Sequence, residues 1–393
     1  MRNLVPVQVR PIATCEGPPR ALGRAQGEQL RDRIRGAVQD LEQVEPYQLL
    51  KPRWMPAPLF RLASEQKATR KFGSAIQSLC PSMADRLLGI SEGSGVPLRS
   101  LWLIQAMEAM LGAVGAYTHV LTPHLGGCTA LAVRNGGQSG SGPLLAHNFD
   151  YIAPVRPYFA IRESRPSNGY RSVDFLVAPL CGAIDGVNEA GLAVSYNYAM
   201  TTDHGTPAPT LSMRISGLLA GCASVASAIE WLAIQPRWGG GLLMLVDATG
   251  DLASVELTNR EIEVRRPEPG RNWLAHTNKL SGAKTVAVEI DRRAVFDCRA
   301  PGPLRGTNVL ESSIVRYARL EMLLNSASRL DSAEIARILS DHGQDGLGSL
   351  NTICMHSSYW STSASLQLDP VERRLRVSFS PTCQAEYHEY ALT

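Results

Sequence analysis

The chain has 393 residues, of which 44 % are hydrophobic and 19 % are charged, and its formal net charge at pH 7 is +3. This composition is typical of a globular protein with a sizeable core, and so small a net charge argues against binding to nucleic acid or to an anionic membrane. No stretch approaches the roughly 20 apolar residues of a membrane span. The N-terminus also lacks the apolar region of a secretory signal, so we expect a cytoplasmic protein.

The eight cysteines and eight histidines are scattered along the chain. Neither a C-x-x-C pair nor an H-E-x-x-H motif occurs among them, and such spacings are the usual signs of a metal site in a sequence. The pattern therefore predicts reduced thiols, with no disulfide framework, no metal site and no cofactor.

The first third of the chain is predicted to be helical. Apolar residues recur at near-helical spacing in residues 21–44, 62–88 and 98–114. Prolines interrupt the pattern between residues 46 and 60, which indicates a loop, and Pro81 is expected to break or bend the second helical segment.

From residue 128 the apolar period changes from about 3.6 to about 2, as is typical of strands. Strands are expected at residues 128–134, 143–150, 158–164, 172–180, 192–198, 242–246, 253–257, 261–265, 273–276, 364–368 and 375–379. Helices are expected at residues 211–220, 225–234, 314–324 (capped by Ser312 or Ser313) and from Asp331 to Ser340. Together these elements predict an α+β protein in which two sheets stack.

Gly126 and Gly127 run directly into Cys128, which opens an apolar run typical of a buried strand. This arrangement suits a precursor that cleaves itself, because the Cys128 thiol could attack the unhindered Gly127 carbonyl and water could release the resulting thioester. Cys128 would then carry a free α-amino group, whose pKa of about 7.7–8.0 lets it accept the thiol proton near neutrality. The alternative from these residues alone is a turn followed by an ordinary core thiol.

Three other polar residues are candidates for the same chemistry. If the strands at 128–134 and 143–150 pair, Asp150 would lie near Cys128 and could orient its new ammonium group; the alternative is a plain turn. Asn197 lies in an apolar strand and needs polar partners, one of which could be a substrate oxygen. Asn278 follows a strand and could donate to a developing oxyanion, unless it forms only an Asx turn.

For two arginines and two histidines, the sequence leaves open whether they take part in the same chemistry. Arg316 and Arg319 lie three residues apart on one helix, where they could bind a substrate carboxylate or the catalytic aspartate, or form surface ion pairs. His147 and His276 are possible partners in a Cys–His pair, but a free N-terminal amine would make an imidazole base unnecessary.

Seven short motifs follow one another along the chain: Gly127-Cys128-Thr129, His147-Asn148-Phe149-Asp150, Gly186-Val187-Asn188-Glu189-Ala190-Gly191-Leu192, Ala275-His276-Thr277-Asn278, Ser312-Ser313-x-x-Arg316-Tyr317-x-Arg319-Leu320, Leu339-Ser340-Asp341-His342 and Asn351-Thr352-Ile353-Cys354. In this order they resemble the motifs of the penicillin acyltransferase family (acyl-coenzyme A:6-aminopenicillanic acid acyltransferases), which are cysteine N-terminal-nucleophile (Ntn) hydrolases. Each motif is weakly specific by itself, and their shared order makes the resemblance specific.

The resemblance implies a four-layer αββα fold with a helical N-terminal segment, cut into chains of residues 1–127 and 128–393 that stay associated. It also implies that the nucleophile forms an acyl-thioester from an amide or an acyl-CoA and passes the acyl group to water or to an amine. By position, Asp150 matches the aspartate beside the nucleophile, Asn278 the oxyanion donor, and Asn197 the second oxyanion asparagine of the related bile-salt hydrolases.

The complete set of predicted site residues is Cys128, Asp150, Asn197 and Asn278 for catalysis, Gly127 and Cys128 for cleavage, and Arg316, Phe149 and Tyr151 for substrate binding. The only partner expected is the small-molecule acyl amide or acyl-CoA substrate, with neither nucleic acid nor a membrane.

Two features depart from the family pattern. His147 stands where bile-salt hydrolases and acid-ceramidase-like enzymes carry arginine, which favours the acyltransferase branch, a branch that also resembles amidases acting on β-alanyl amines. The loop at residues 136–142 is longer than that of the family, which leaves the shape of the acyl pocket open. An unprocessed Cys–His thiol hydrolase and an inactive binding relative are the alternative functions.

Overall fold

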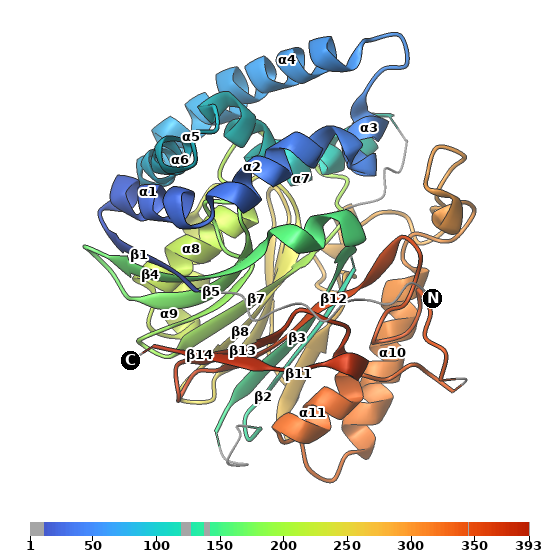
Figure 1. Cartoon of the computed structure of the whole chain (residues 1–393). Helices are drawn as coiled ribbons and strands as arrows, with labels where there is room; N and C mark the ends of the chain where they lie inside the picture. Colours follow the sequence, from blue (N-terminus) through green and yellow to red (C-terminus); the bar gives the residue numbers. More distant parts are fainter. Residues whose placement is uncertain (1–11, 119–126, 137–141, 345, 393) are drawn as a thin grey trace.

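The computed structural model describes residues 12–118, 127–136, 142–344 and 346–392. These residues form two stacked β-sheets with helices on both outer faces (Figure 1). The layers run helices, eight-stranded sheet, six-stranded sheet, helices, so the four-layer αββα sandwich expected from the sequence is confirmed.

Nearly all neighbouring strands in both sheets are antiparallel. The eight-stranded sheet contains, in spatial order, β1 (Ile12–Gly17), β4 (Phe159–Pro166), β5 (Ser172–Val177), β6 (Asp185–Asn188), β7 (Leu192–Tyr198), β8 (Gly241–Asp247), β9 (Leu252–Leu257) and β10 (Ile262–Arg265). The six-stranded sheet contains β11 (Trp273–His276), β2 (Cys128–Val133), β3 (Leu144–Ile152), β12 (Trp360–Asp369), β13 (Arg374–Ser378) and β14 (His388–Ala391). The exception is β1, which pairs with β4 in parallel.

Helices from the N-terminal part cover the eight-stranded sheet, and two C-terminal helices cover the other (Figure 1). The N-terminal helices are α1 (Pro19–Gln29), α2 (Arg31–Asp40), α3 (Glu45–Leu50), α4 (Ala57–Lys67), α5 (Ser74–Leu79), α6 (Pro81–Ser94) and α7 (Leu98–Thr118). The later helices are α8 (Leu211–Gly221), α9 (Val225–Ile234), α10 (Glu311–Ser326) and α11 (Ser332–Leu339). Both α10 and α11 pack on the outer side of β2 and β3.

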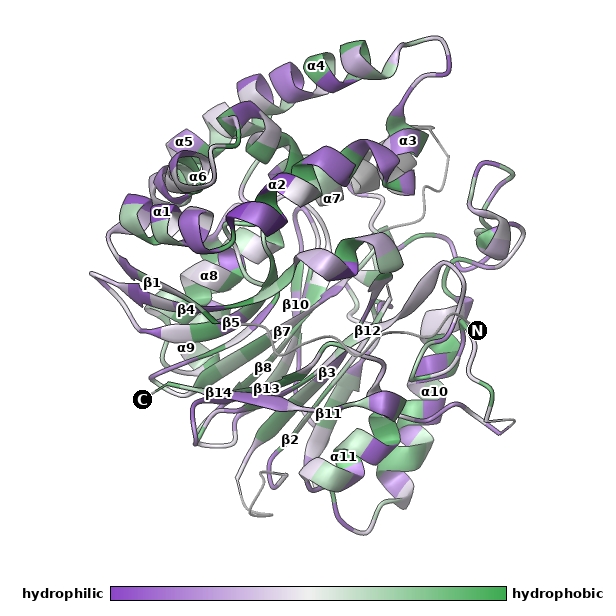
Figure 2. Cartoon of the chain, in the orientation of Figure 1, coloured by the Kyte–Doolittle hydropathy of each residue, from purple (hydrophilic) through white to green (hydrophobic). Residues whose placement is uncertain are grey.

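The strands of both sheets are mostly hydrophobic, as Figure 2 shows. Alternate residues of a strand point to opposite faces, and this alternation divides the side chains of β2 and β3. Those that join the core between the sheets are Cys128, Ala130, Ala132, Leu145 and Phe149. The intervening residues point toward α10 and α11, so each of these two strands is buried on both faces.

The first third differs from the expected helices in two respects. Ile12–Gly17 form strand β1, so the N-terminal part also supplies the edge of a sheet whose other strands come later in the chain. The loop expected at residues 46–60 contains α3 and the beginning of α4, because prolines there occupy the first helical turn, where a missing N–H costs nothing. The break predicted at Pro81 is confirmed, because α5 ends at Leu79 and Pro81 occupies the first turn of α6.

Most of the expected later elements are confirmed, with ends shifted by a few residues, while β6 and β14 were not expected. The cap predicted at Ser312 or Ser313 is wrong: α10 begins at Glu311, and the Ser312 hydroxyl donates to the Leu350 carbonyl (2.6 Å). Asp331 does cap α11, accepting the Glu334 N–H at 2.9 Å. Residues 137–141 of the loop singled out in the sequence lie outside the described part of the chain.

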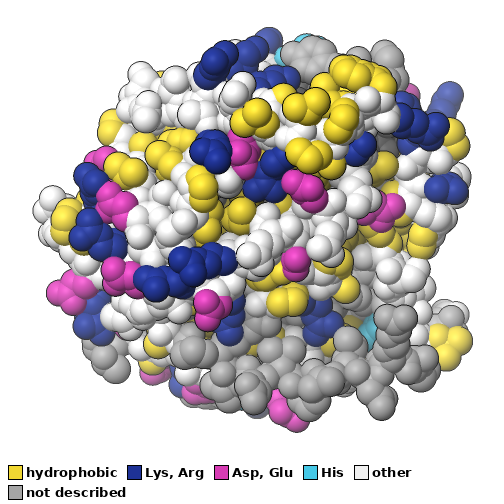
Figure 3. Space-filling view, turned by 45° about the horizontal axis from the view of Figure 1, so that its top comes forward, with side chains coloured by type: hydrophobic (Ala, Val, Ile, Leu, Met, Phe, Trp, Pro, Cys, Tyr) yellow, Lys and Arg dark blue, Asp and Glu magenta, His cyan; other side chains and the backbone are white. Residues whose placement is uncertain are grey.

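The face over the N-terminal helices carries basic and acidic side chains interspersed with hydrophobic ones (Figure 3). This mixture agrees with the small net charge of the whole chain. Among the helices of the described residues, none is long and apolar enough to cross a membrane.

Candidate active site

The Gly127–Cys128 peptide lies at the beginning of β2. Strand β2 pairs antiparallel with β3, and Cys128 lies opposite Phe149. The predicted pairing is therefore confirmed, and it brings the neighbouring Asp150 to the Gly127–Cys128 peptide: the Asp150 N–H donates to the Gly127 carbonyl oxygen at 3.1 Å.

Position 127 has little space for a side chain. A Cβ atom there would lie 3.1 Å from the Met355 methyl carbon, 3.3 Å from Arg316 Nη2 and 3.6 Å from Asp150 Oδ2. Glycine therefore lets the backbone approach a buried carboxylate and a buried guanidinium at the same time.

Arg316 and Asn278 hold the backbone of Cys128 on either side. The Cys128 N–H donates to Asn278 Oδ1 (2.8 Å), and the Cys128 carbonyl accepts from Arg316 Nη1 (2.6 Å). The guanidinium also donates to Asn278 Oδ1 (2.9 Å) and to the Thr129 hydroxyl (2.7 Å). Because Arg316 is only 1 % exposed and is occupied by groups of its own chain, its position favours support of the Cys128 backbone over direct contact with a substrate.

Asp150 is fully buried, and its two carboxylate oxygens have different surroundings. Oδ1 accepts a hydrogen bond from the Thr362 hydroxyl (2.6 Å), while Oδ2 has no hydrogen-bond partner and lies 4.0 Å from Arg316 Nη1. Burial raises the pKa of this carboxyl to about 6, against the opposing effects of Arg316 and Thr362. Asp150 can thus change its protonation state near neutral pH.

The thiol of Cys128 is 4 % exposed within the apolar core. Burial, followed by the nearby negative charge of Asp150, raises the pKa of this thiol well above its ordinary value. The group is therefore a neutral thiol at physiological pH and needs a base before it can attack a carbonyl.

Asn278 and Asn197, the two predicted oxyanion donors, are both buried. Each donates a hydrogen bond to the backbone carbonyl of the residue next to the other asparagine. Asn278 Nδ2 donates to the Tyr198 carbonyl (2.9 Å), and Asn197 Nδ2 donates to the Thr277 carbonyl (3.1 Å). A side-chain amide has two N–H groups, so each asparagine retains a second N–H beyond this hydrogen bond. Asn197 Oδ1 is buried without a partner.

Neither candidate histidine contacts Cys128. In the strand register both His147 and His276 lie beside Ala130, two residues further along β2. His147 Nδ1 bonds to Asp185 Oδ2 (2.7 Å), and His276 Nδ1 bonds to the Ser254 hydroxyl (2.8 Å). Within the described residues no Cys128–His pair is formed, which argues against a Cys–His hydrolase.

The two arginines of α10 have different environments. Arg319 forms a bidentate ion pair with Asp341 (2.9 and 2.7 Å) near the surface. The surface ion pair that the sequence left open thus applies to Arg319, while Arg316 lies at Cys128.

A largely apolar cavity lies between the N-terminal helices and the sheets. Residues of α2, α7, β3 and β5, of the segments that follow them and of the beginning of α8 line it: Ala37, Leu41, Val44, Ile104, Gln105, Met107, Tyr151, Val155, Tyr158, Val177, Pro179, Leu180, Thr210 and Ser212. Tyr151 stacks on Phe149 with ring centroids 4.9 Å apart, and Phe149 is the strand partner of Cys128. Of the two aromatic residues predicted to bind substrate, Tyr151 lines the cavity and Phe149 lies behind it.

Sequence reasoning missed three side chains of this site. Thr129 and Thr362 hydrogen-bond to Arg316 and Asp150, and Met355 packs against Gly127. Thr362 is 212 residues from Asp150, so no local pattern connects the two. The identity of Thr129, directly after Cys128, was the one signal available.

The chain is similar to a known protein family. The model of the family described as acyl-coenzyme A:6-aminopenicillanic acid acyl-transferase matches residues 137–382. No curated protein sequence matches the chain.

Solved structures that are similar share little sequence. An ortholog of N-acylethanolamine-hydrolyzing acid amidase from Caenorhabditis elegans is 13 % identical, with 68 % of this chain and 100 % of that chain covered and a TM-score of 0.42. Penicillin V acylase from Agrobacterium tumefaciens is 16 % identical (68 % and 78 % covered, TM-score 0.37). Conjugated bile acid hydrolase from Clostridium perfringens is 15 % identical (68 % and 97 % covered, TM-score 0.42).

The family model covers well over half of the chain, and the sandwich of two sheets between helix layers is the fold expected of that family. The protein is thus an enzyme of acyl-group chemistry, and it belongs to the acyl-coenzyme A:6-aminopenicillanic acid acyl-transferase family.

Proposed function

We propose that this chain cleaves itself between Gly127 and Cys128, and that the new N-terminal Cys128 then takes an acyl group from an amide and passes it to water or to an amine. The observation that carries the proposal is that both sides of this one peptide are held by polar groups. The Asp150 N–H donates to the Gly127 carbonyl (3.1 Å), and Asn278 Oδ1 accepts from the Cys128 N–H (2.8 Å).

Self-cleavage begins when Asp150 Oδ2 accepts the proton of the Cys128 thiol and the sulfur adds to the Gly127 carbonyl carbon. The Asp150 N–H stabilises the negative charge that develops on the carbonyl oxygen. The C–N bond then breaks as its nitrogen takes up the proton, which leaves a thioester between Gly127 and the Cys128 sulfur. Water hydrolyses the thioester to a Gly127 carboxylate and a free Cys128 thiol.

In the mature enzyme the α-amino group of Cys128 is the base. Its pKa of about 7.7–8.0 is close to physiological pH, so it can take the thiol proton and return it to the leaving amine. The remaining amide N–H groups of Asn278 and Asn197 are the donors to the substrate oxyanion. Asp150 and Arg316 position the ammonium group and the backbone of Cys128.

The acyl group is apolar and lies in the cavity lined by Tyr151. Support comes from the lining, which is mostly aliphatic and aromatic, and from the continuous contact from Tyr151 through Phe149 to Cys128. Walls of the cavity come from both predicted chains, 1–127 and 128–393, so the two must stay associated for the pocket to exist.

The test is the mass of the purified protein. The unmodified sequence is expected to yield two chains, the second beginning at Cys128, and to form a Cys128 acyl-thioester with substrate. Cys128→Ala should remain one chain without activity, while Cys15→Ala, a buried cysteine in β1, should behave like the unmodified enzyme. A continuous chain that still turns over amides would contradict the proposal.

A further inference from the structure

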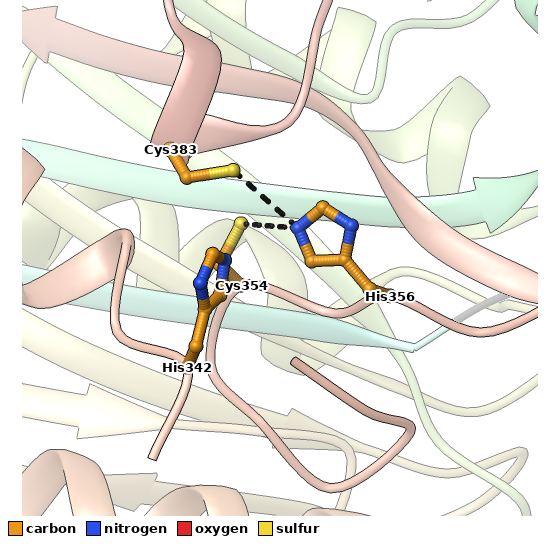
Figure 4. Close-up of side chains that lie close together, drawn as sticks. All are labelled: His342, Cys354, His356 and Cys383. Carbon is orange, nitrogen blue, oxygen red and sulfur yellow. Dashed lines mark hydrogen bonds between the residues drawn. The ribbon is translucent and has the colours of Figure 1, made fainter. Parts of the chain in front are cut away.

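Four side chains that can bind a metal ion gather beside the C-terminal end of α11, and the proposed chemistry uses none of them (Figure 4). His342 follows α11, Cys354 and His356 precede β12, and Cys383 lies in the 3₁₀ turn Thr382–Gln384. Their ligand atoms all lie within 4.8 Å of one another.

Two sulfur atoms approach the same histidine nitrogen. His356 Nε2 lies 3.5 Å from Cys354 Sγ and 3.4 Å from Cys383 Sγ. An imidazole nitrogen has either one hydrogen or one lone pair, so it cannot make a good hydrogen bond to both sulfurs. In a tetrahedral site with Zn–S of about 2.3 Å and Zn–N of about 2.0–2.1 Å, sulfur and nitrogen ligands are about 3.6 Å apart. The two observed distances fit ligands that share one ion.

His342 supplies a second, independent observation. Its Nε2 atom is buried and has no hydrogen-bond partner, which is costly for a polar atom unless it binds something. The ring packs edge-on against His356, with centroids 4.8 Å apart, and Figure 4 shows the ring beside the two cysteines. Its nitrogen therefore completes a set of four.

We propose that His342, Cys354, His356 and Cys383 bind one structural Zn²⁺ ion. Two thiolates with two imidazoles are a usual tetrahedral zinc set, and the thiolates balance the charge of the ion. Four protein ligands leave no open position for substrate, so the site is structural. The sequence did not indicate it because its ligands come from three separate segments.

The ion would support the candidate active site through the segment between its ligands. The Met355 N–H donates to the Thr362 hydroxyl (2.8 Å), which donates to Asp150 Oδ1 (2.6 Å). Asn148, two residues before Asp150, donates to the Leu339 and Ile353 carbonyls (2.8 and 3.1 Å). Zinc bound at this place holds the same backbone that positions Asp150.

The experiment measures zinc in the full-length protein, purified without an affinity tag and dialysed to remove loosely bound metal. Elemental analysis is expected to find one Zn²⁺ per chain. Cys383→Ser and His342→Gln should lose it, while Cys298→Ser, which alters an exposed cysteine elsewhere, should keep it. Stripping with a chelator should lower the melting temperature of the unmodified protein, and adding Zn²⁺ should restore it.

Co²⁺ replacement tests the geometry without any variant, which matters if a variant fails to fold. We expect the intense absorption bands of tetrahedral Co²⁺ together with a thiolate-to-cobalt charge-transfer band. Weak octahedral bands without charge transfer would overturn the proposal. So would protein without zinc, whether Cys354 and Cys383 are free thiols or form a disulfide, and so would zinc that persists in both variants.

Discussion

The inner face of the β2–β3 pair is mostly apolar and aromatic, with His147 as a polar exception, whereas its outer face carries several buried polar groups. Phe149 and the Cys128 side chain belong to the core between the sheets. Thr129, Asn148 and Asp150 point the other way and hydrogen-bond to Arg316, to the last residue of α11 and to Thr362. One pair of strands thus separates a mostly apolar environment from a more polar one.

The difference between the two faces explains why the candidate nucleophile, Cys128, is the first residue of a strand. Cys128 directs its side chain to the inner face, near the aromatic rings that lead to the cavity. Its backbone nitrogen and carbonyl instead meet Asn278 and Arg316. The thiol can therefore face the apolar side while polar groups hold the backbone of the same residue on the other side, and a strand interior, whose backbone is occupied by neighbouring strands, does not offer this.

The largest expected effect comes from exchanging one polar group on each face. Asp150→Asn on the outer face should slow self-cleavage by about 10²- to 10⁴-fold, because the variant loses its base. His147→Gln on the inner face should change the rate only a few-fold, since His147 is bonded to Asp185 and not to Cys128. The fraction of cleaved chain, followed by intact mass over time, measures both rates. If both variants lost the same fraction of the self-cleavage rate, the two faces would not differ in function.

Next in size is the effect of the two arginines on stability. Arg316→Met leaves Asp150 buried without its nearby cation and should lower the free energy of unfolding by about 3–5 kcal/mol. Arg319→Met removes a partly exposed ion pair and should cost about 1 kcal/mol or less. Urea denaturation of both variants, made on the Cys128→Ala chain to avoid cleavage, is the measurement. A similar loss in both would show that burial of Arg316 has no energetic consequence.

The pH dependence of self-cleavage sharpens the assignment of Asp150. Because the pKa of this carboxyl is raised to about 6, its basic form is lost below pH 6, and the rate should fall about tenfold per pH unit there and level off above. The raised pKa also means that the folded chain holds this proton more tightly, so the contribution of Asp150 to stability decreases as pH rises from about 4 to 6. Rates measured in a series of buffers test this, with Asp150→Asn as the variant that should show no such step. A rate that stays constant down to pH 4 would rule out Asp150 as the base.

The smallest effect is expected on the inner face. Tyr151→Leu should raise KM several-fold for a substrate with a long acyl chain and leave an acetyl substrate nearly unchanged, because only the long chain reaches the cavity. Steady-state kinetics with the two substrates give the comparison, the acetyl substrate being the control. An equal rise for both would mean that the cavity does not hold the acyl group.

Local pattern made part of the fold and of the candidate site predictable. The strand at Leu192–Tyr198 and the helix at Val225–Ile234 have the bounds predicted for them, since the apolar period of each is unambiguous. Asp150 could be placed beside Cys128 because adjacent strands commonly pair and the two residues lie on consecutive strands.

Other contacts had no local signal. Strand β1 pairs with β4, far along the chain, and Asp150 meets Thr362 across 212 positions. In the sequence, Arg316 and Arg319 are two similar arginines three residues apart on one predicted helix. Only the packing of α10 buries Arg316 and leaves Arg319 partly exposed. The four proposed zinc ligands are likewise brought together by three distant segments.

By itself, then, the sequence determined the succession of helical and strand segments and the Gly127–Cys128 motif, because periodicity and residue type act over a few neighbouring positions. The tertiary structure decided which polar groups meet at that motif and which cysteines and histidines converge near α11. These contacts depend on how whole elements pack, and packing joins residues regardless of their separation in the chain.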